Sequence, residues 1–286
     1  MTAGDERPGP PEARGAGGRR VFLSDVHLSP RRPERARRLI GFLEREAHRT
    51  AELYILGDLF DYWIGPKHLA RPDYRDALDA LARATRGGLR VVFIHGNRDF
   101  YMRGFEEATG IEVPPGRTEL RLDVGGRQVL LCHGDYLEGR RGLGFRIQEF
   151  IRSRPVEWVW TRLPGCLAAL GARFYRWVSG RKGRRPRRAG AAGRGPHGLS
   201  EDALRAEFGR GTDVIVCGHV HAAQEVALEV DGRPRTLLTL GCWSDGESYV
   251  VEEDGRWTLC AGPGEAAAET GAKKDSGRTG GHSTTA

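Results

Sequence analysis

The sequence of 286 residues has few cysteines and no long hydrophobic run. Its five cysteines form no Cys-x-x-Cys pair, which argues against a structural zinc site. Cys132 and Cys217 end apolar runs, in which they would pack as small hydrophobic side chains. No uncharged stretch reaches the roughly 18 apolar residues that crossing a bilayer requires. The first residues include Asp5 and Glu6 instead of an apolar segment, which argues against a secretory signal. We therefore expect a cytoplasmic protein that is soluble or sits on a surface.

Both ends of the chain lack apolar periodicity. Residues 1–18 and 261–286 are rich in Gly, Pro, Ala, Ser, Thr and charge, so we expect disordered tails around one domain at 19–260. The net charge of +7 is concentrated in the run RKGRRPRR at 181–188, which supplies six positive charges and no negative ones. The basic charge is therefore a local patch, within a linker at 181–198, and not a property of the whole surface.

Apolar runs alternate with amphipathic segments in the first half of the chain. Strand-like runs at Arg20–Leu23, Glu52–Leu56 and Leu89–Ile94 are separated by helical spacing over Pro33–His48 and Tyr74–Arg86. This alternation predicts an α/β layered fold with an at least partly parallel sheet.

Short strands joined by glycine turns dominate the second half. Gly-Gly and Asp-Gly pairs mark three turns, and Ser200 is a plausible N-cap for a helix to Phe208. The strands predicted there are Glu119–Val124, Gln128–Cys132, Asp213–Cys217, Glu225–Val230, Thr236–Leu240, Ser248–Glu252 and Trp257–Cys260. The second half is therefore expected to be rich in β structure.

Residues 143–180 have a different composition, with helical spacing and three of the six tryptophans. We interpret this segment as an inserted helical cap. Beside the basic run, its apolar stripe has the composition of an interfacial helix that meets an anionic membrane, or of a lid over acyl chains. The alternative is an ordinary amphipathic helix packed on the core. The stripe comprises Leu163, Leu167, Leu170, Phe174 and Trp177.

Five apolar runs each end in polar residues of metal-ligand type. Taken singly, each residue has an ordinary explanation, because an Asp after a strand is commonly a turn or cap and a His is commonly a hydrogen-bonded core residue. The set is more informative, because ligands of open α/β sheets bind beyond the carboxyl ends of the strands, where these sites could converge. The set comprises Asp25, His27, Asp58, Asn97, His133, His219 and His221.

Carboxylate and amide oxygens mixed with imidazole nitrogens suit Mn²⁺, Fe or Zn²⁺. Seven ligands are too many for one tetrahedral ion, but they suit two ions that share a bridging ligand. Two metals about 3.5–4 Å apart can hold a hydroxide nucleophile and clamp the oxygens of an in-line phosphoryl displacement. The set therefore predicts hydrolysis of a phosphoester or phosphoanhydride.

The motifs SDVHL, LGDLFDYW, HGNRDF, CHGD and GHVH, in this order, resemble those of the calcineurin-like metallophosphoesterases. The resemblance implies a four-layer αββα sandwich that binds two divalent ions. It implies that His219 and His221 serve different ions, with Val220 turned away between them. The ligands of one ion would be Asp25, His27, Asp58 and His221. Those of the other would be Asp58, Asn97, His133 and His219, with Asp58 as the bridge.

The third motif, GNRD at 96–99, and the run YILGDLFDYWIG resemble the UDP-2,3-diacylglucosamine hydrolase family of lipid A biosynthesis. The resemblance implies hydrolysis of the substrate pyrophosphate to UMP and 2,3-diacylglucosamine 1-phosphate, usually with Mn²⁺. The protein would be peripheral, on the cytoplasmic face of the inner membrane. One departure from the family is the stretch EGRRGLGF after the His133 motif, which offers basic Arg140 and Arg141 where the family carries an acid.

Three residues are expected to contact the substrate, namely Asn97, Arg98 and His219, and two of them, Asn97 and Arg98, to take part in catalysis. The guanidinium of Arg98 could hold phosphoryl oxygens and offset charge that develops at phosphorus. The alternative for Arg98 is a structural ion pair with its neighbour Asp99.

Two other functions fit parts of the sequence. The run at 181–188 could contact the phosphates of a nucleic acid, but no base-stacking residues interleave with it, so no nucleic-acid partner is expected. A non-catalytic scaffold could dock a partner through the same patch, although all seven ligand positions carry competent residues. The sequence predicts neither the oligomeric state nor the residues that contact a nucleotide.

Overall fold

The fold is described from a computed structural model of the chain. The structure describes residues 18–138 and 196–261, apart from 64, 100–101, 103, 115–117 and 245, together with positions 156 and 159. The expected tails, the cap at 143–180 with its apolar stripe, and the basic run lie outside the described residues, except for these few positions. None of the described helices is both long and apolar enough to cross a membrane.

The first sheet has five strands in the order β10-β9-β1-β2-β3. Its strands are β1 (Arg20–Leu23), β2 (Glu52–Leu56), β3 (Arg90–Ile94), β9 (Ser248–Glu253) and β10 (Arg256–Ala261). The three neighbouring strands β1, β2 and β3 run parallel, whereas β9 is antiparallel to both β1 and β10. β1 and β2 are buried over their whole length, and this explains why both read as continuous apolar runs.

The second sheet also has five strands, in the order β4-β5-β6-β8-β7. Its strands are β4 (Glu119–Val124), β5 (Arg127–Cys132), β6 (Val214–Cys217), β7 (Gln224–Val230) and β8 (Arg233–Thr239). β5, β6 and β8 are parallel neighbours, and the antiparallel strands β4 and β7 form the two edges. The parallel strands of each sheet therefore end side by side.

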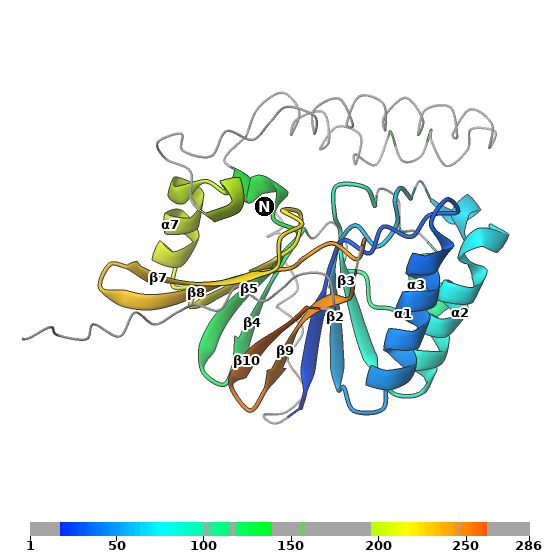
Figure 1. Ribbon diagram of the computed structural model, residues 1–286, viewed down its shortest axis with the longest axis horizontal. Helices are drawn as coiled ribbons and strands as arrows, with labels where there is room; N and C mark the ends of the chain where they lie inside the picture. Colours follow the sequence, from blue (N-terminus) through cyan, green and yellow to red (C-terminus); the bar gives the residue numbers. More distant parts are fainter. Residues whose placement is uncertain are drawn as a thin grey trace, which may run out of the picture.

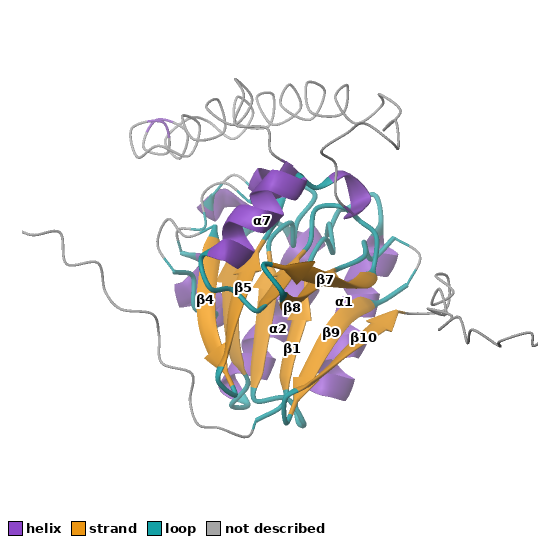
Figure 2. Cartoon of the chain, turned by 90° about the vertical axis from the view of Figure 1, so that its left-hand side faces the viewer, coloured by secondary structure: helices purple, strands orange, loops and turns teal. Residues whose placement is uncertain are grey.

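The two sheets pack face to face, with helices on both outer faces (Figures 1 and 2). Phe22, Tyr54, Leu131 and Val216 lie between the sheets in one apolar cluster. A second cluster joins the first sheet to α1 (Pro33–Glu46), α2 (Pro72–Arg86) and the short α3 (Phe105–Thr109). A third joins the second sheet to α7 (Glu201–Gly209). These layers confirm the predicted αββα sandwich.

Most predicted elements match within one or two residues. Ser200 caps α7 as expected, because its hydroxyl accepts from the backbone N–H of Ala203. β8 begins earlier than predicted. Asp231 and Gly232 both have positive φ and form a tight turn, so strand pairing starts directly at Val230 and Arg233. The sequence analysis missed α3 and three short 3₁₀ helices, η1 (Pro66–His68), η2 (Asp135–Glu138) and η3 (Pro196–Gly198). Such short elements lack enough residues to show a periodicity.

Acid sensitivity of the fold is expected at His68, which is buried against the rings of Tyr62, Trp63 and Tyr74. Burial and the nearby charge of Arg71 lower the pKa of His68 from 6.5 to about 4. Between these values the unfolded chain binds the proton more readily, so stability falls as the pH drops from about 6.5 to about 4. Between pH 7 and pH 5, protonation of this residue should lower the free energy of unfolding by about 2 kcal/mol. We expect His68→Gln to abolish this part of the loss. Urea unfolding of both proteins at both pH values measures this, and identical losses would contradict it.

Candidate metal centre

All seven predicted ligands follow parallel strands, at the edge where these strands end. The structure brings them together from the two sheets, through the loops that follow β1, β2, β3, β5 and β6. Backbone hydrogen bonds join the first of these loops to the second, since the N–H groups of Asp25 and His27 donate to the carbonyls of Gly57 and Asp58. The ligands are Asp25 and His27 after β1, Asp58 after β2, Asn97 after β3, His133 after β5, and His219 and His221 after β6.

Five of these residues have a left-handed backbone, with φ between 51° and 68°. The other described non-glycine residues with positive φ are Asp231 and Asp254, each in an Asp-Gly hairpin turn. A positive φ costs energy for a residue with a Cβ, and such strain gathers at functional sites where the surrounding structure maintains it. The five residues are Asp25, His27, Asp58, His219 and His221.

Glycines allow the loops to approach one another closely. A Cβ on Gly96 would overlap the backbone N and the Oδ1 of Asp58. A Cβ on Gly218 would overlap Ser24 Oγ and Asp25 Oδ2. The glycines of the Gly-Asn and Gly-His pairs are therefore required by space at the centre of the site.

The first group of side chains consists of Asp25, His27 and His221. Asp25 Oδ1 lies 3.1 Å from His221 Nε2 and 3.5 Å from His27 Nε2, and the two Nε2 atoms are 3.4 Å apart. The other carboxylate oxygen of Asp25 accepts from Ser24 Oγ at 2.7 Å and from the N–H of His219 at 2.8 Å. Asp25 Oδ1 and His27 Nδ1 are buried and have no hydrogen-bond partner among the described residues. Buried polar atoms of this kind are costly, and a cation bound beside Asp25 Oδ1 would satisfy that oxygen.

The second group consists of His133, His219 and Asn97. His219 Nδ1 lies 3.3 Å from His133 Nε2 and 3.0 Å from the side-chain amide of Asn97. His133 is fully buried, and its Nδ1 donates to the carbonyl oxygen of Leu56 at 2.9 Å. This hydrogen bond fixes the ring so that Nε2 points to the group with a free lone pair, as in metal-binding histidines.

Asp58 lies between the two groups and offers one oxygen to each. Its Oδ2 is 4.0 Å from His27 Nδ1, and its Oδ1 is 3.7 Å from His133 Nε2. Val220 is buried in the cluster beneath α7, so the chain directs His221 to the first group and His219 to the second. The geometry suits two neighbouring cations that share Asp58.

The pKa values within the site depend on this clustering. Burial alone would raise the pKa of Asp25, but the contact with His221 and the charges of His133, His221 and His27 hold it well below its ordinary value. Burial lowers the pKa of His27 and outweighs the opposite effect of Asp58 and Asp25. For His133 the carboxylates outweigh burial, and its pKa rises. The site therefore holds an ionised Asp25 against imidazoles, a donor set that suits divalent cations.

Arg98 lies at the rim of the site with its guanidinium between two carboxylates. Its Nε is 3.4 Å from Asp58 Oδ2, and its Nη1 is 2.8 Å from Asp61 Oδ1. The structure does not show the alternative ion pair between Arg98 and Asp99, both of which are described residues. Asp99 is fully buried and accepts from the N–H of Asp58 at 2.5 Å. Burial and the negative charge of Asp58 raise the pKa of Asp99 well above its ordinary value. Asp99 thus fixes the loop that carries Asp58, while Arg98 stays at the rim.

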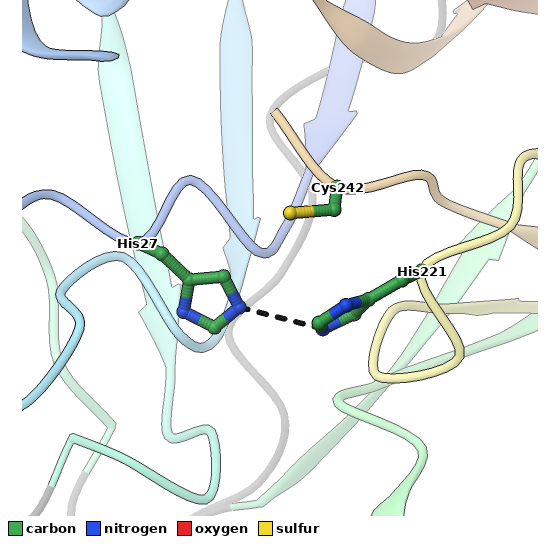
Figure 3. A group of neighbouring side chains, drawn as sticks. All are labelled: His27, His221 and Cys242. Atoms are coloured by element: carbon green, nitrogen blue, oxygen red, sulfur yellow. Dashed lines mark hydrogen bonds between the residues drawn. The ribbon is translucent and has the colours of Figure 1, made fainter. Parts of the chain in front are cut away.

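The sequence analysis missed two further residues of the site. Glu138, at the end of η2, lies with Oε1 3.4 Å from His219 Nε2. Arg140 and Arg141 lie outside the described residues. Cys242 follows β8, and its sulfur lies within 4.8 Å of ligand atoms of His27 and His221 (Figure 3). A polar residue just after a predicted strand was the available signal for Cys242, the same signal that identified the other seven.

Comparison with known proteins gives matches over most of the chain. Residues 18–223 match the family described as calcineurin-like phosphoesterase. A UDP-2,3-diacylglucosamine hydrolase from Pseudomonas aeruginosa is 33% identical over 238 residues, which cover 82% of this chain and 94% of that protein. An enzyme of the same name from Azotobacter vinelandii is 32% identical over 236 residues, with the same coverage of both chains. A solved structure of a dimetal phosphatase from Danio rerio is 13% identical, with a TM-score of 0.44 and coverage of 87% of this chain and 96% of that chain.

Proposed function

Since the chain belongs to the calcineurin-like phosphoesterase family of metal-dependent hydrolases, we propose that its substrate is UDP-2,3-diacylglucosamine. The observation that carries this proposal is the similarity to hydrolases of that name, which covers 94% of their length at 32–33% identity. The GNRD motif at 96–99 also supports it, because this form of the third motif resembles that of the same hydrolase family.

The proposed reaction is hydrolysis of the pyrophosphate. The oxygen of a water molecule forms a bond to one phosphorus atom, and the bond from that phosphorus to the bridging oxygen breaks. The water supplies a proton to the leaving phosphate and a hydroxyl to the attacked phosphorus. The products are UMP and 2,3-diacylglucosamine 1-phosphate.

The ligands proposed for the two ions are the groups described above. Asp25, His27, Asp58 and His221 would hold one ion, and Asp58, Asn97, His133 and His219 the other. The unpartnered Asp25 Oδ1 and the fixed ring of His133 fit this role. When bound, such a pair lowers the pKa of a water molecule and offsets charge on phosphoryl oxygens. We propose Mn²⁺ as the metal, with Fe or Zn²⁺ as alternatives at either position.

Three side chains are proposed to act on the substrate itself. The guanidinium of Arg98 is partly exposed at the rim, where it can bind phosphoryl oxygens and offset the charge of the transition state. The Asn97 amide and the His219 ring are 3.0 Å apart and border the same space, so both are placed to orient the phosphoryl group.

Membrane association is proposed on composition alone. The apolar stripe and the basic run RKGRRPRR at 181–188 would place the protein on an anionic bilayer, as a peripheral protein on the cytoplasmic face of the inner membrane. A substrate with two acyl chains is presented there.

The experiment that tests the function offers UDP-2,3-diacylglucosamine in mixed micelles to the purified full chain with Mn²⁺, and it measures UMP. We expect UMP release that stops when EDTA removes the metal and returns when Mn²⁺ is added. If no UMP is released but a small soluble phosphodiester is hydrolysed, the proposed substrate is wrong and the protein is a phosphodiesterase with another substrate. Cleavage of DNA or RNA without UMP would favour a nucleic-acid substrate, and no hydrolysis at all would favour the scaffold.

A further inference from the structure

Cys242 is held firmly at the edge of the metal centre by its two neighbours. The N–H of Gly241 donates to Ser248 Oγ at 2.8 Å. Trp243 is fully buried, its indole donates to the carbonyl of Ser248 at 2.9 Å, and its backbone N–H lies 3.3 Å from the carbonyl of Asp25, which accepts from it. The loop after β8 is thus attached to the loop after β1 that carries Asp25, so the position of the thiol is set by both sheets.

The thiol is directed at the first group of ligands. Figure 3 shows its sulfur on one side of the gap between the rings of His27 and His221. The sulfur and one nitrogen of each ring lie within 4.8 Å of one another. Metal–sulfur bonds of about 2.3 Å and metal–nitrogen bonds of about 2.0 Å place two ligands of a tetrahedral ion about 3.5 Å apart, so a movement of the thiol by about 1 Å suffices.

A second observation also indicates a cation between these side chains. Asp25 is fully buried, and its Oδ1 has no hydrogen-bond partner among the described residues. This oxygen lies within 3.5 Å of the Nε2 atoms of both His27 and His221, the same rings that the thiol approaches. A carboxylate oxygen, two imidazoles and a thiol thus converge on one space.

We propose that Cys242 is a sulfur ligand of the ion held by Asp25, His27, Asp58 and His221, an inference that rests on the dinuclear centre of the proposed function. Binding breaks the S–H bond, forms a metal–sulfur bond and releases the thiol proton to solvent. The second ion has only oxygen and nitrogen ligands from Asp58, Asn97, His133 and His219. Because thiolates prefer Zn²⁺, Co²⁺ and Fe²⁺ to Mn²⁺, the two positions differ in metal preference, and the first takes the softer ion.

Cobalt gives a readout that does not depend on turnover, because a Co²⁺–thiolate bond produces an intense near-ultraviolet charge-transfer absorption. Metal-free full chain is titrated with Co²⁺ beside the variants Cys242→Ser and Cys260→Ser. Cys260 lies on the edge strand β10 and belongs to neither group of possible metal ligands among the described residues, so it is the matched control. The absorption should appear in the parent chain and in Cys260→Ser and be missing from Cys242→Ser. Its absence from the parent chain loaded with Co²⁺, or its persistence in Cys242→Ser, would overturn the proposal.

Metal preference gives a second measurement on the same proteins. Each is dialysed against equal concentrations of Zn²⁺ and Mn²⁺, and the bound metals are counted. The parent chain should retain zinc at one position, and Cys242→Ser should lower the Zn²⁺ to Mn²⁺ ratio at least about tenfold. An unchanged ratio would count against the proposal.

The parent chain alone keeps the proposal testable if Cys242→Ser does not fold. Iodoacetamide labelling of the peptide that contains Cys242, followed by mass spectrometry, should slow when Zn²⁺ is bound. An unchanged labelling rate with zinc bound would overturn the inference. UMP release measured in parallel separates the two ideas, because cobalt–sulfur absorption without UMP leaves the ligand and removes the substrate. UMP release without that absorption would keep the proposed substrate and remove the sulfur ligand.

Discussion

Asp58→Asn should lower turnover by about 10³-fold or more, and it should weaken metal binding at both positions of the same protein. Asp58 places one oxygen 4.0 Å from His27 and the other 3.7 Å from His133, so it is the side chain that both groups share. Loss of its negative charge weakens the binding of both cations, which would offset the negative charge of the transition state. Each 1.36 kcal/mol of that stabilisation is a factor of ten in rate. Metal content and kcat, measured on the same preparation, test this.

The substitution should leave the fold intact. Asn has almost the shape of Asp, and its carbonyl oxygen can still accept the backbone N–H of Arg98, which donates to Asp58 Oδ1 at 2.9 Å. The backbone N–H of Asp58 keeps its bond to Asp99. A lowered unfolding temperature with normal metal content would therefore indicate a structural effect instead of the loss of a shared ligand.

Asp61→Asn is the matched control for this prediction. Asp61 comes from the same loop and pairs with the same guanidinium, at 2.8 Å from Arg98, but it is not one of the proposed ligands. We expect it to keep two ions per chain and to change kcat by less than about tenfold, since it only helps to place Arg98. Equal losses in Asp58→Asn and Asp61→Asn would contradict a bridging role for Asp58.

The sequence predicted the parallel strands and the loops of the site because both depend on local patterns, whereas the sandwich was implied by the resemblance of the motifs. Buried parallel strands give apolar runs, and the residue that follows each run is fixed at one edge of the sheet. Gly96 and Gly218 show why the motifs pair glycine with a ligand, since a Cβ at either position would overlap a carboxylate oxygen. Val220, which the resemblance places between ligands of two ions, is buried.

Contacts between loops could not be predicted from these patterns. Glu138 reaches His219 because η2 turns the chain back after His133, and a turn of four residues has no periodicity to detect. Asp99 follows Arg98 directly, yet it bonds to the backbone of a loop 41 residues earlier. Cys242 belongs to the site because Trp243 is attached to Asp25 in the other sheet. Each of these contacts joins residues whose distance is set by tertiary packing alone.

Loss of either histidine of GHVH should remove one ion, and a different one in each case. His221 lies 3.1 Å from Asp25 and 3.4 Å from His27, whereas His219 lies 3.3 Å from His133 and 3.0 Å from Asn97. His221→Ala should therefore weaken the ion near Asp25, and His219→Ala the ion near His133. Each variant should bind one equivalent of metal firmly and lose about 10³-fold in kcat, because a single ion cannot clamp both the attacking and the leaving oxygen.

Cobalt spectra can tell which ion has been lost. If Cys242 binds the ion near Asp25, His221→Ala should lose most of the sulfur absorption and His219→Ala should keep it. His48→Ala, at an exposed position just beyond α1, is the control and should keep two ions and the full absorption. Loss of both ions in either histidine variant would contradict two separate groups, because it would mean that one ion cannot stay bound without the other. We expect each variant to retain one ion, with the sulfur absorption present in His219→Ala and largely absent from His221→Ala. The reason is that the backbone buries Val220 and sends its two neighbours to opposite sides of Asp58.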